Sequence, residues 1–130
     1  MAPEDVVNVL HNMVRAVRLG GAILDLQVIR PNPRVELDDE LIGEIDGWPL
    51  FEKADAAVDA VDAMIRSSLL FEEAIDDHDV RKHYPNGTDL VDDFKDSARR
   101  IPEEAIPRLH AIAQPLVVRE HCRLRRLTVV

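Results

Sequence analysis

The sequence predicts a small α/β protein in which helices flank a short sheet. An amphipathic helical pattern ends at Gly20-Gly21 and leads directly into an apolar run of strand length at residues 22–29. A second helical pattern covers residues 53–66, and a β-prone segment closes the chain at residues 116–130. Helix, glycine turn and strand in this order form half of an α/β unit, which is the basis of the fold-class prediction.

The first helix is predicted from Pro3, because the first helical turn tolerates proline and the following acidic residues favour the helix dipole. Its inward face comprises Val6, Val9, Leu10, Met13, Val14 and Val17. The strand at residues 22–29 is predicted to be covered on both faces, as in a parallel sheet, so we expect Leu26→Asp to prevent folding. Asp25 and Gln27 share one face, which must therefore meet polar partners or a cleft.

The middle of the chain is predicted to contain a small hairpin followed by a helix and a strand. Two short segments of residues 35–52 flank Asp46-Gly47, a dipeptide that favours a hairpin turn. The helix at 53–66 places its apolar residues on one face. A strand is expected to run from Leu69 toward Ile75 and to resume from Val80 to Tyr84.

The C-terminal third is predicted to hold two short helices and the closing strand. Thr88 is the expected N-cap of a helix that places Leu90, Val91, Phe94 and Ala98 inward. Pro102 marks another helix start, and Pro107 must kink or restart that helix.

The composition limits the number of domains and the kinds of site that the chain can form. The 130 residues suit one domain spanning residues 1–130, with an aliphatic core because aromatic residues make up only 4%. No apolar run reaches the roughly 20 residues of a membrane helix, and no secretory signal is visible, so we expect a cytoplasmic protein without a membrane partner. The single Cys122 excludes an internal disulfide and a multi-cysteine zinc site.

The charge balance argues against a nucleic-acid partner, because the formal net charge is −9 and phosphate binding needs clustered Lys and Arg. The basic end, formed by Arg119, Arg123, Arg125 and Arg126, is the one candidate patch. We interpret it as a solvated strand that balances an acidic surface, and one position open to such a strand is the edge of the sheet.

The densest polar cluster is Asp76-Asp77-His78-Asp79 with His83 nearby. Carboxylates and imidazoles can ligate divalent metals, but the five-residue spacing of His78 and His83 fits neither a strand face nor a helix face. The cluster is therefore interpreted as a solvated acidic loop at a strand bend, and no metal site is predicted.

Other nucleophilic or basic side chains also receive structural interpretations. Cys122 and His121 are strand neighbours that point to opposite faces, so Cys122 is expected to be a small core residue. His11 and His110 are expected at helix surfaces. The sequence contains no glycine-rich phosphate loop and no G-x-S-x-G pattern, so catalytic and cofactor-binding residues stay unknown.

Residues 10–26, LHNMVRAVRLGGAILDL, resemble the L-x-x-x-x-R-x-L-R-P-G-G-x-L-L segment of class I S-adenosylmethionine-dependent methyltransferases, with Leu19 in place of the usual proline. The resemblance implies a partial Rossmann-like, mixed sheet of about three main strands plus a small hairpin. It also implies that the closing strand at 117–130 inserts antiparallel between the strands at 22–29 and 69 onward.

The family's cofactor is held mainly by a glycine-rich loop in its N-terminal half, and residues 1–130 contain no such loop. The resemblance therefore implies a half-domain that is inactive alone and binds no cofactor by itself, with S-adenosylmethionine bound only if a complementary half is present. A half-sheet also leaves a strand edge to cover, so we expect pairing with a complementary polypeptide or a homodimer. A homodimer would bury roughly 1,200–2,000 Å² around Leu24, Leu26 and Val28.

Two other functions stay open at this point. The chain can be a stand-alone α+β module for dimerisation or small-ligand binding without catalysis, or a small enzyme that uses the region from Asp76 to His83.

Overall fold

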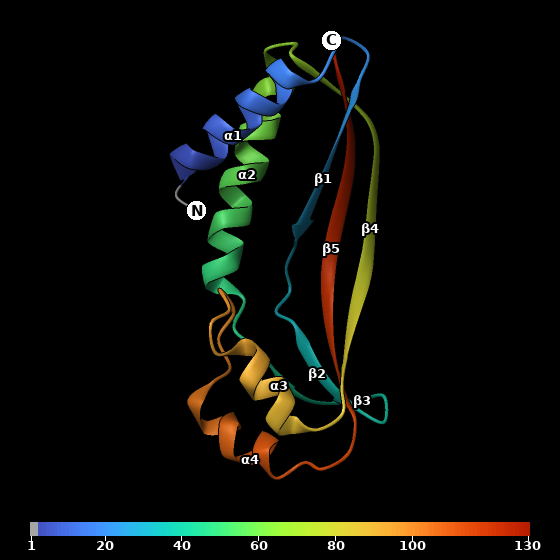
Figure 1. The fold of residues 1–130 in the computed structure, drawn as a ribbon. Coiled ribbons are helices and arrows are strands. Elements are labelled where there is room, and N and C mark those ends of the chain that lie inside the picture. The colour runs from blue at the N-terminus through green and yellow to red at the C-terminus, as the bar shows by residue number, and fades with distance from the viewer. Residues whose placement is uncertain (1–2) are drawn as a thin grey trace. The chain divides into compact units, whose positions relative to one another are not determined.

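A computed structural model describes residues 3–130 and the side chains from Val7 onward (Figure 1). The elements follow in the order α1 (Pro3–Ala16), β1 (Ala22–Val28), β2 (Arg34–Leu37), β3 (Glu40–Glu44), α2 (Trp48–Arg66), β4 (Leu70–Tyr84), α3 (Gly87–Phe94), the 3-10 turn η1 (Glu103–Ala105), α4 (Ile106–His110) and β5 (Leu116–Val129). The chain divides into two compact units, called unit 1 (residues 1–28, 51–78 and 122–130) and unit 2 (residues 29–50 and 79–121).

In unit 1, the helices α1 and α2 lie on the same side of β1 and of the adjoining parts of β4 and β5 (Figure 1). The core between them is aliphatic, as the composition predicts. Its buried members come from both helices and all three strands: Leu10, Ile23, Ala60, Val61, Met64, Leu70, Leu127 and Val129. Burial of these side chains is what holds the helices on the sheet.

In unit 2, the hairpin β2–β3 and the first part of β5 pack against α3 and α4 (Figure 1). The buried members of this core are Val35, Ile45, Tyr84, Leu90, Val91, Phe94, Leu109, Leu116 and Val118. Leu90, Val91 and Phe94 are therefore inward, as the helical spacing predicts. The two helices approach closely, since a Cβ placed on Gly87 would lie 1.7 Å from the carbonyl oxygen of Leu109.

The sheet has five strands, and β5 is its centre. In unit 1, β5 pairs with β1, antiparallel from Ala22↔Thr128 to Val28↔Cys122. In unit 2, it pairs with β2, antiparallel at Val35↔Val118. Strand β5 also pairs with β4. The α/β class is confirmed, but antiparallel strands do not fit a Rossmann-like sheet, so the partial methyltransferase sheet predicted from the sequence is not confirmed.

Strand β1 is covered on one face only. Leu24 and Leu26 are exposed, at 65% and 57%, whereas Ile23 is buried at 3%. The prediction of a strand buried on both faces is therefore wrong. Asp25 and Gln27 lie on the covered face with Ile23, and the Gln27 amide donates to Asp25 Oδ1 at 2.8 Å. The strand itself thus supplies one polar partner, while Asp25 Oδ2 is buried without a hydrogen bond from the described residues.

The hairpin turn lies at Asp38-Asp39, where both residues have positive φ (51° and 64°), as a two-residue type I′ turn requires. The predicted turn at Asp46-Gly47 is wrong. Asp46 instead precedes α2, where its Oδ1 accepts from the backbone N–H of Trp48 at 3.0 Å. This capping starts α2 five residues earlier than the predicted Lys53.

Strand β4 runs without a break from Leu70 to Tyr84, so the predicted acidic loop at a strand bend is wrong. Helix α3 is capped by Asn86, whose side chain accepts from the backbone N–H of Asp89 at 2.8 Å, and not by the predicted Thr88. The restart at Pro107 is confirmed by the change from η1 to α4. The predicted helix before Gly20 and the closing strand are confirmed; the helix ends at Ala16, and Gly20, with φ of 80°, lies in the turn that leads to β1.

Among the helices of residues 3–130, none is long and apolar enough to cross a membrane.

Candidate functional site

The acidic cluster of β4 is paired with the basic residues of β5. Arg123 donates to Asp77 through Nε at 2.7 Å and Nη2 at 2.9 Å. Asp79 accepts from Arg119 Nη1 at 3.1 Å and lies 2.6 Å from His121 Nδ1. The hydrogen bonds from Arg123 and from Arg119 lower the pKa of the Asp77 and Asp79 carboxyls, respectively. The cluster is thus a set of cross-strand ion pairs.

These pairs account for the candidate residues that the sequence singled out for metal chemistry. His78 Nδ1 lies 3.1 Å from Asp76 Oδ2 on the same strand. His83 does not join these two residues in a group that could hold a metal ion. Within the described residues, no three or more His, Cys, Asp or Glu side chains are placed to hold a metal ion together.

The basic end balances an acidic surface, as predicted, but the predicted solvated strand is wrong, because β5 is largely covered, Arg125 is buried, and the strand is not at a sheet edge. Arg125 forms ion pairs with Asp62 and Glu72, and Arg126 Nε lies 3.0 Å from Glu73 Oε2. Because β5 lies between β1 and β4, its arginines reach carboxylates on neighbouring elements. Cys122 is buried, as expected for a small core residue. His11 and His110 are exposed on their helices, as predicted, and His110 Nδ1 lies 3.1 Å from Thr88 Oγ1.

A pocket in unit 2 is the strongest candidate for a binding site. Strands β2 and β3 form one wall, and the segment from Ile101 through α4 forms the other. The tight Asp38-Asp39 turn holds β3 beside β2, and the close contact at Gly87 sets α4 against α3. The cavity has a volume of about 190 Å³ and is lined by Val35, Leu37, Ile42, Gly43, Glu44, Ile45, Ile101, Ala105, Arg108, Leu109 and Ile112.

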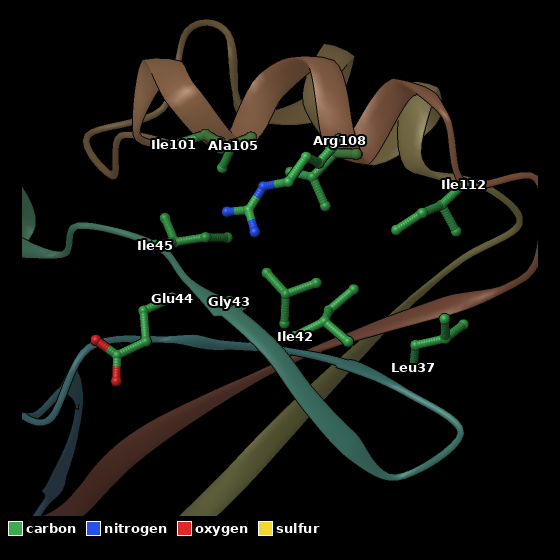
Figure 2. A pocket seen from close by; sticks show the side chains of 11 residues that line it. Leu37, Ile42, Gly43, Glu44, Ile45, Ile101, Ala105, Arg108 and Ile112 are labelled. Carbon is green, nitrogen blue, oxygen red and sulfur yellow. The ribbon is translucent and has the colours of Figure 1, made fainter.

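Two charged residues, Glu44 and Arg108, are among the otherwise apolar residues that line this pocket. Figure 2 shows Arg108 reaching from α4 toward Ile45, while the carboxylate of Glu44 points away from the guanidinium. Among the residues with described side chains, Arg108 forms no hydrogen bond or ion pair. A guanidinium has five N–H donors in a planar fork that matches a carboxylate. The pocket therefore combines an apolar volume with a free anion-binding group at its side.

Sequence reasoning did not find this pocket. Arg108 interrupts a stripe of apolar residues at Ile101, Ala105, Leu109 and Ile112, whose spacings of three and four place them on one helical face. This stripe was an available signal for the helical wall. The other wall comes from a hairpin more than 55 positions earlier in the chain, and the sequence pattern places its turn incorrectly.

Comparisons with known proteins identify no relative. No family model, no curated protein and no solved structure matches this chain. The resemblance to methyltransferases therefore stays a prediction from residues 10–26.

Proposed function

We propose that the protein is a small-ligand-binding module whose pocket in unit 2 takes a carboxylic acid with a short apolar tail. The observation that carries this proposal is the guanidinium of Arg108, which has no partner in the described part of the chain and lies beside an aliphatic cavity. Such pockets bind by burying apolar surface and use a few polar groups to orient the ligand.

The volume of the pocket limits the size of the ligand. An apolar cavity of about 150 Å³ is enough for benzene, so about 190 Å³ suits a tail of roughly six to eight carbon atoms. Each buried methylene contributes about 0.8 kcal/mol. Because association itself costs several kcal/mol, we expect dissociation constants between the micromolar and millimolar ranges.

Octanoate and octan-1-ol share the apolar chain, and only octanoate has a charged head. Comparing them separates the contribution of the apolar chain from that of the carboxylate. Titration of the ¹⁵N-labelled protein should shift the amide resonances of β3 and α4 with both ligands, and octanoate should bind more tightly. Arg108→Gln should weaken octanoate by about tenfold or more, since hydrogen bonds to charged groups contribute roughly 1.5–3 kcal/mol, and should leave octanol unchanged.

Two further variants complete the experiment. Ala105→Leu fills the pocket and should weaken both ligands, whereas Arg100→Gln removes an exposed charge of the same unit that does not line this pocket. The proposal fails if octanoate shifts no resonance of β3 or α4, or if Arg108→Gln and Arg100→Gln weaken it equally.

A methyltransferase-like half-domain, inactive alone, is the second candidate, and one observation favours it. Strand β5 lies between β1 and β4 and runs antiparallel to β1, which is the position that the resemblance implies for the closing strand. Against it stand the antiparallel sheet and the missing glycine-rich loop. Calorimetric titration with S-adenosylmethionine, with and without the product of a neighbouring gene, tests it: binding only with a complementary chain supports this function.

A further inference from the structure

The edge strand β4 is long and open. It pairs only with β5 among the strands of the described residues, and residues 73–83 are exposed without interruption. Figure 1 shows β4 beside β5, on the side away from β1. A strand of 15 residues with unpaired N–H and C=O groups along one edge is a template for pairing with another strand.

The charges on β4 are separated along its length. The first half carries Glu72, Glu73, Asp76 and Asp77, and the second half carries Asp79 followed by Arg81, Lys82 and His83. The two glutamates already bind residues of β5, since Glu72 accepts from Arg125 and Glu73 from Thr128.

The basic half has no such carboxylate partners. Lys82 Nζ lies 6.0 Å from the centroid of the Phe94 ring. In the part of the chain with described side chains, Arg81 and His83 form no ion pair or hydrogen bond. The strand therefore presents an acidic half next to a half in which Arg81 has no carboxylate partner among the residues with described side chains.

The geometry points to a homodimer in which the β4 strands of two copies pair edge to edge, antiparallel and centred on Asp77. A two-fold axis perpendicular to the sheet keeps side chains on the same face, so the centre must fall on a residue. Centring on Asp77 places these complementary residues across from each other: Glu72 with Lys82, Glu73 with Arg81, Asp76 with His78, and the apolar Ala74 with Val80. Symmetry repeats each of these pairs.

Two other positions of this register involve aspartate without a complementary residue across from it. Ile75 lies opposite Asp79, which keeps its hydrogen bond from Arg119 of its own chain. Asp77 faces its own copy, and each Asp77 already accepts two hydrogen bonds from Arg123 of its own chain. These charge-assisted bonds compensate the negative charges that the register brings to the contact.

The neighbouring registers are less favourable. A centre on His78 places Asp77 opposite Asp79, and a centre on Asp76 places Glu73 opposite Asp79. Both arrangements repeat a like-charge pair by symmetry, and neither keeps Glu73 opposite Arg81. The charge pattern of β4 therefore favours the centre on Asp77.

Complementary charge reversals test the register. Arg81→Glu and Glu73→Arg each replace two attractive pairs of the homodimer by repulsive ones, so each variant alone should dimerise roughly tenfold or more weakly. A mixture of the two variants restores both pairs, because a copy with two glutamates at positions 73 and 81 then faces a copy with two arginines there. Sedimentation velocity at micromolar concentration should show a wild-type dimer, two weakened variants and a heterodimer in the mixture.

The controls separate this interface from its alternatives. Arg100→Glu reverses an exposed charge outside β4 and should leave the dimer intact. Circular dichroism of each variant shows whether it is folded, and recovery on mixing shows that it is competent to pair. A monomeric wild-type chain would overturn the proposal, as would single variants that stay fully dimeric or a mixture that stays monomeric. Loss of the dimer in Leu24→Glu or Leu26→Glu, with Arg81→Glu unaffected, would assign the contact instead to the exposed face of β1 predicted from the sequence.

Discussion

Arg125 is buried in unit 1 and its guanidinium is held by the carboxylate of Glu72, which accepts from Nε at 2.7 Å. Nη2 of the same guanidinium donates to Asp62 at 3.0 Å. The side chain of Arg125 is 8% exposed, while those of Glu72 and Asp62 are 32% and 41% exposed. One buried cation thus connects β5 to β4 and to α2.

Removing this cation should destabilise the protein. Arg125→Met leaves the two carboxylates without their partner, which costs about 3–5 kcal/mol where a charge stays buried. Since Glu72 and Asp62 are partly exposed and regain water, we expect a loss of about 2–3 kcal/mol in the free energy of unfolding, measured by urea denaturation.

Arg126→Met is the matched control. Arg126 lies 3.0 Å from Glu73, but its side chain is 59% exposed, so the change should stay within about 0.5 kcal/mol. Equal losses in the two variants would show that the burial of Arg125 contributes nothing.

The helices and the long strands were predictable because their signals are local. Spacings of three and four residues place the buried positions of α2 and α3, and glycine or proline marks several ends. The orientation of β1 was not predictable. Its apolar run fits either face, and the covered face depends on pairing with residues about 100 positions later in the chain, where the buried Ile23 lies opposite the buried Leu127. The polar residues Asp25 and Gln27 therefore lie on the covered face, and Leu24 and Leu26 do not.

Single substitutions to aspartate distinguish the two faces of β1. Ile23→Asp places a carboxylate in the core of unit 1 and should cost more than about 3 kcal/mol or prevent folding. Leu26→Asp, at 57% exposure, should change the free energy of unfolding by less than about 1 kcal/mol. Thermal denaturation, monitored by circular dichroism, measures the stability of both variants. A chain unfolded by Leu26→Asp would restore the sequence-based prediction that both faces are buried.

The candidate site was less accessible to sequence reasoning than the fold. The polar cluster of β4 was visible, but the partners that neutralise it lie on β5, 40 or more positions later. The hairpin turn was missed because Asp38-Asp39 lacks the glycine that usually supplies positive φ. Without that turn, the wall of the pocket opposite Arg108 could not be placed.

Two glycines of unit 2 should respond differently to a methyl group. Gly87→Ala places Cβ against the backbone of Leu109, at 1.7 Å from its oxygen, so α3 and α4 must separate. We expect a loss of about 2–3 kcal/mol in the free energy of unfolding, in the range of overpacked cores. Gly43→Ala meets no atom within 4 Å and should be nearly neutral. Octanoate binding should weaken in Gly87→Ala, because Leu109 lines the pocket; a wild-type stability in this variant would contradict the close contact of the two helices.

The ion pairs between β4 and β5 predict an acid-sensitive contribution to stability. The pKa of Asp77 is lowered from its ordinary 3.8, chiefly by the hydrogen bond from Arg123, and that of Asp79 is lowered, chiefly by the hydrogen bond from Arg119. A carboxyl whose folded-state pKa is lowered stabilises the fold above its unfolded-state pKa. These contributions are therefore present above pH 3.8 and are lost as the pH falls through the folded-state values.

Carbon NMR titration of the aspartate carboxyls tests each pair separately. Both midpoints should lie below 3.8 in the wild-type protein. Arg123→Gln should raise the midpoint of Asp77 and leave Asp79 low, because Asp79 keeps Arg119 and His121; Arg119→Gln should have the reverse effect. If both aspartates respond equally to either substitution, the shifts come from the general charge of β5 and not from these specific hydrogen bonds.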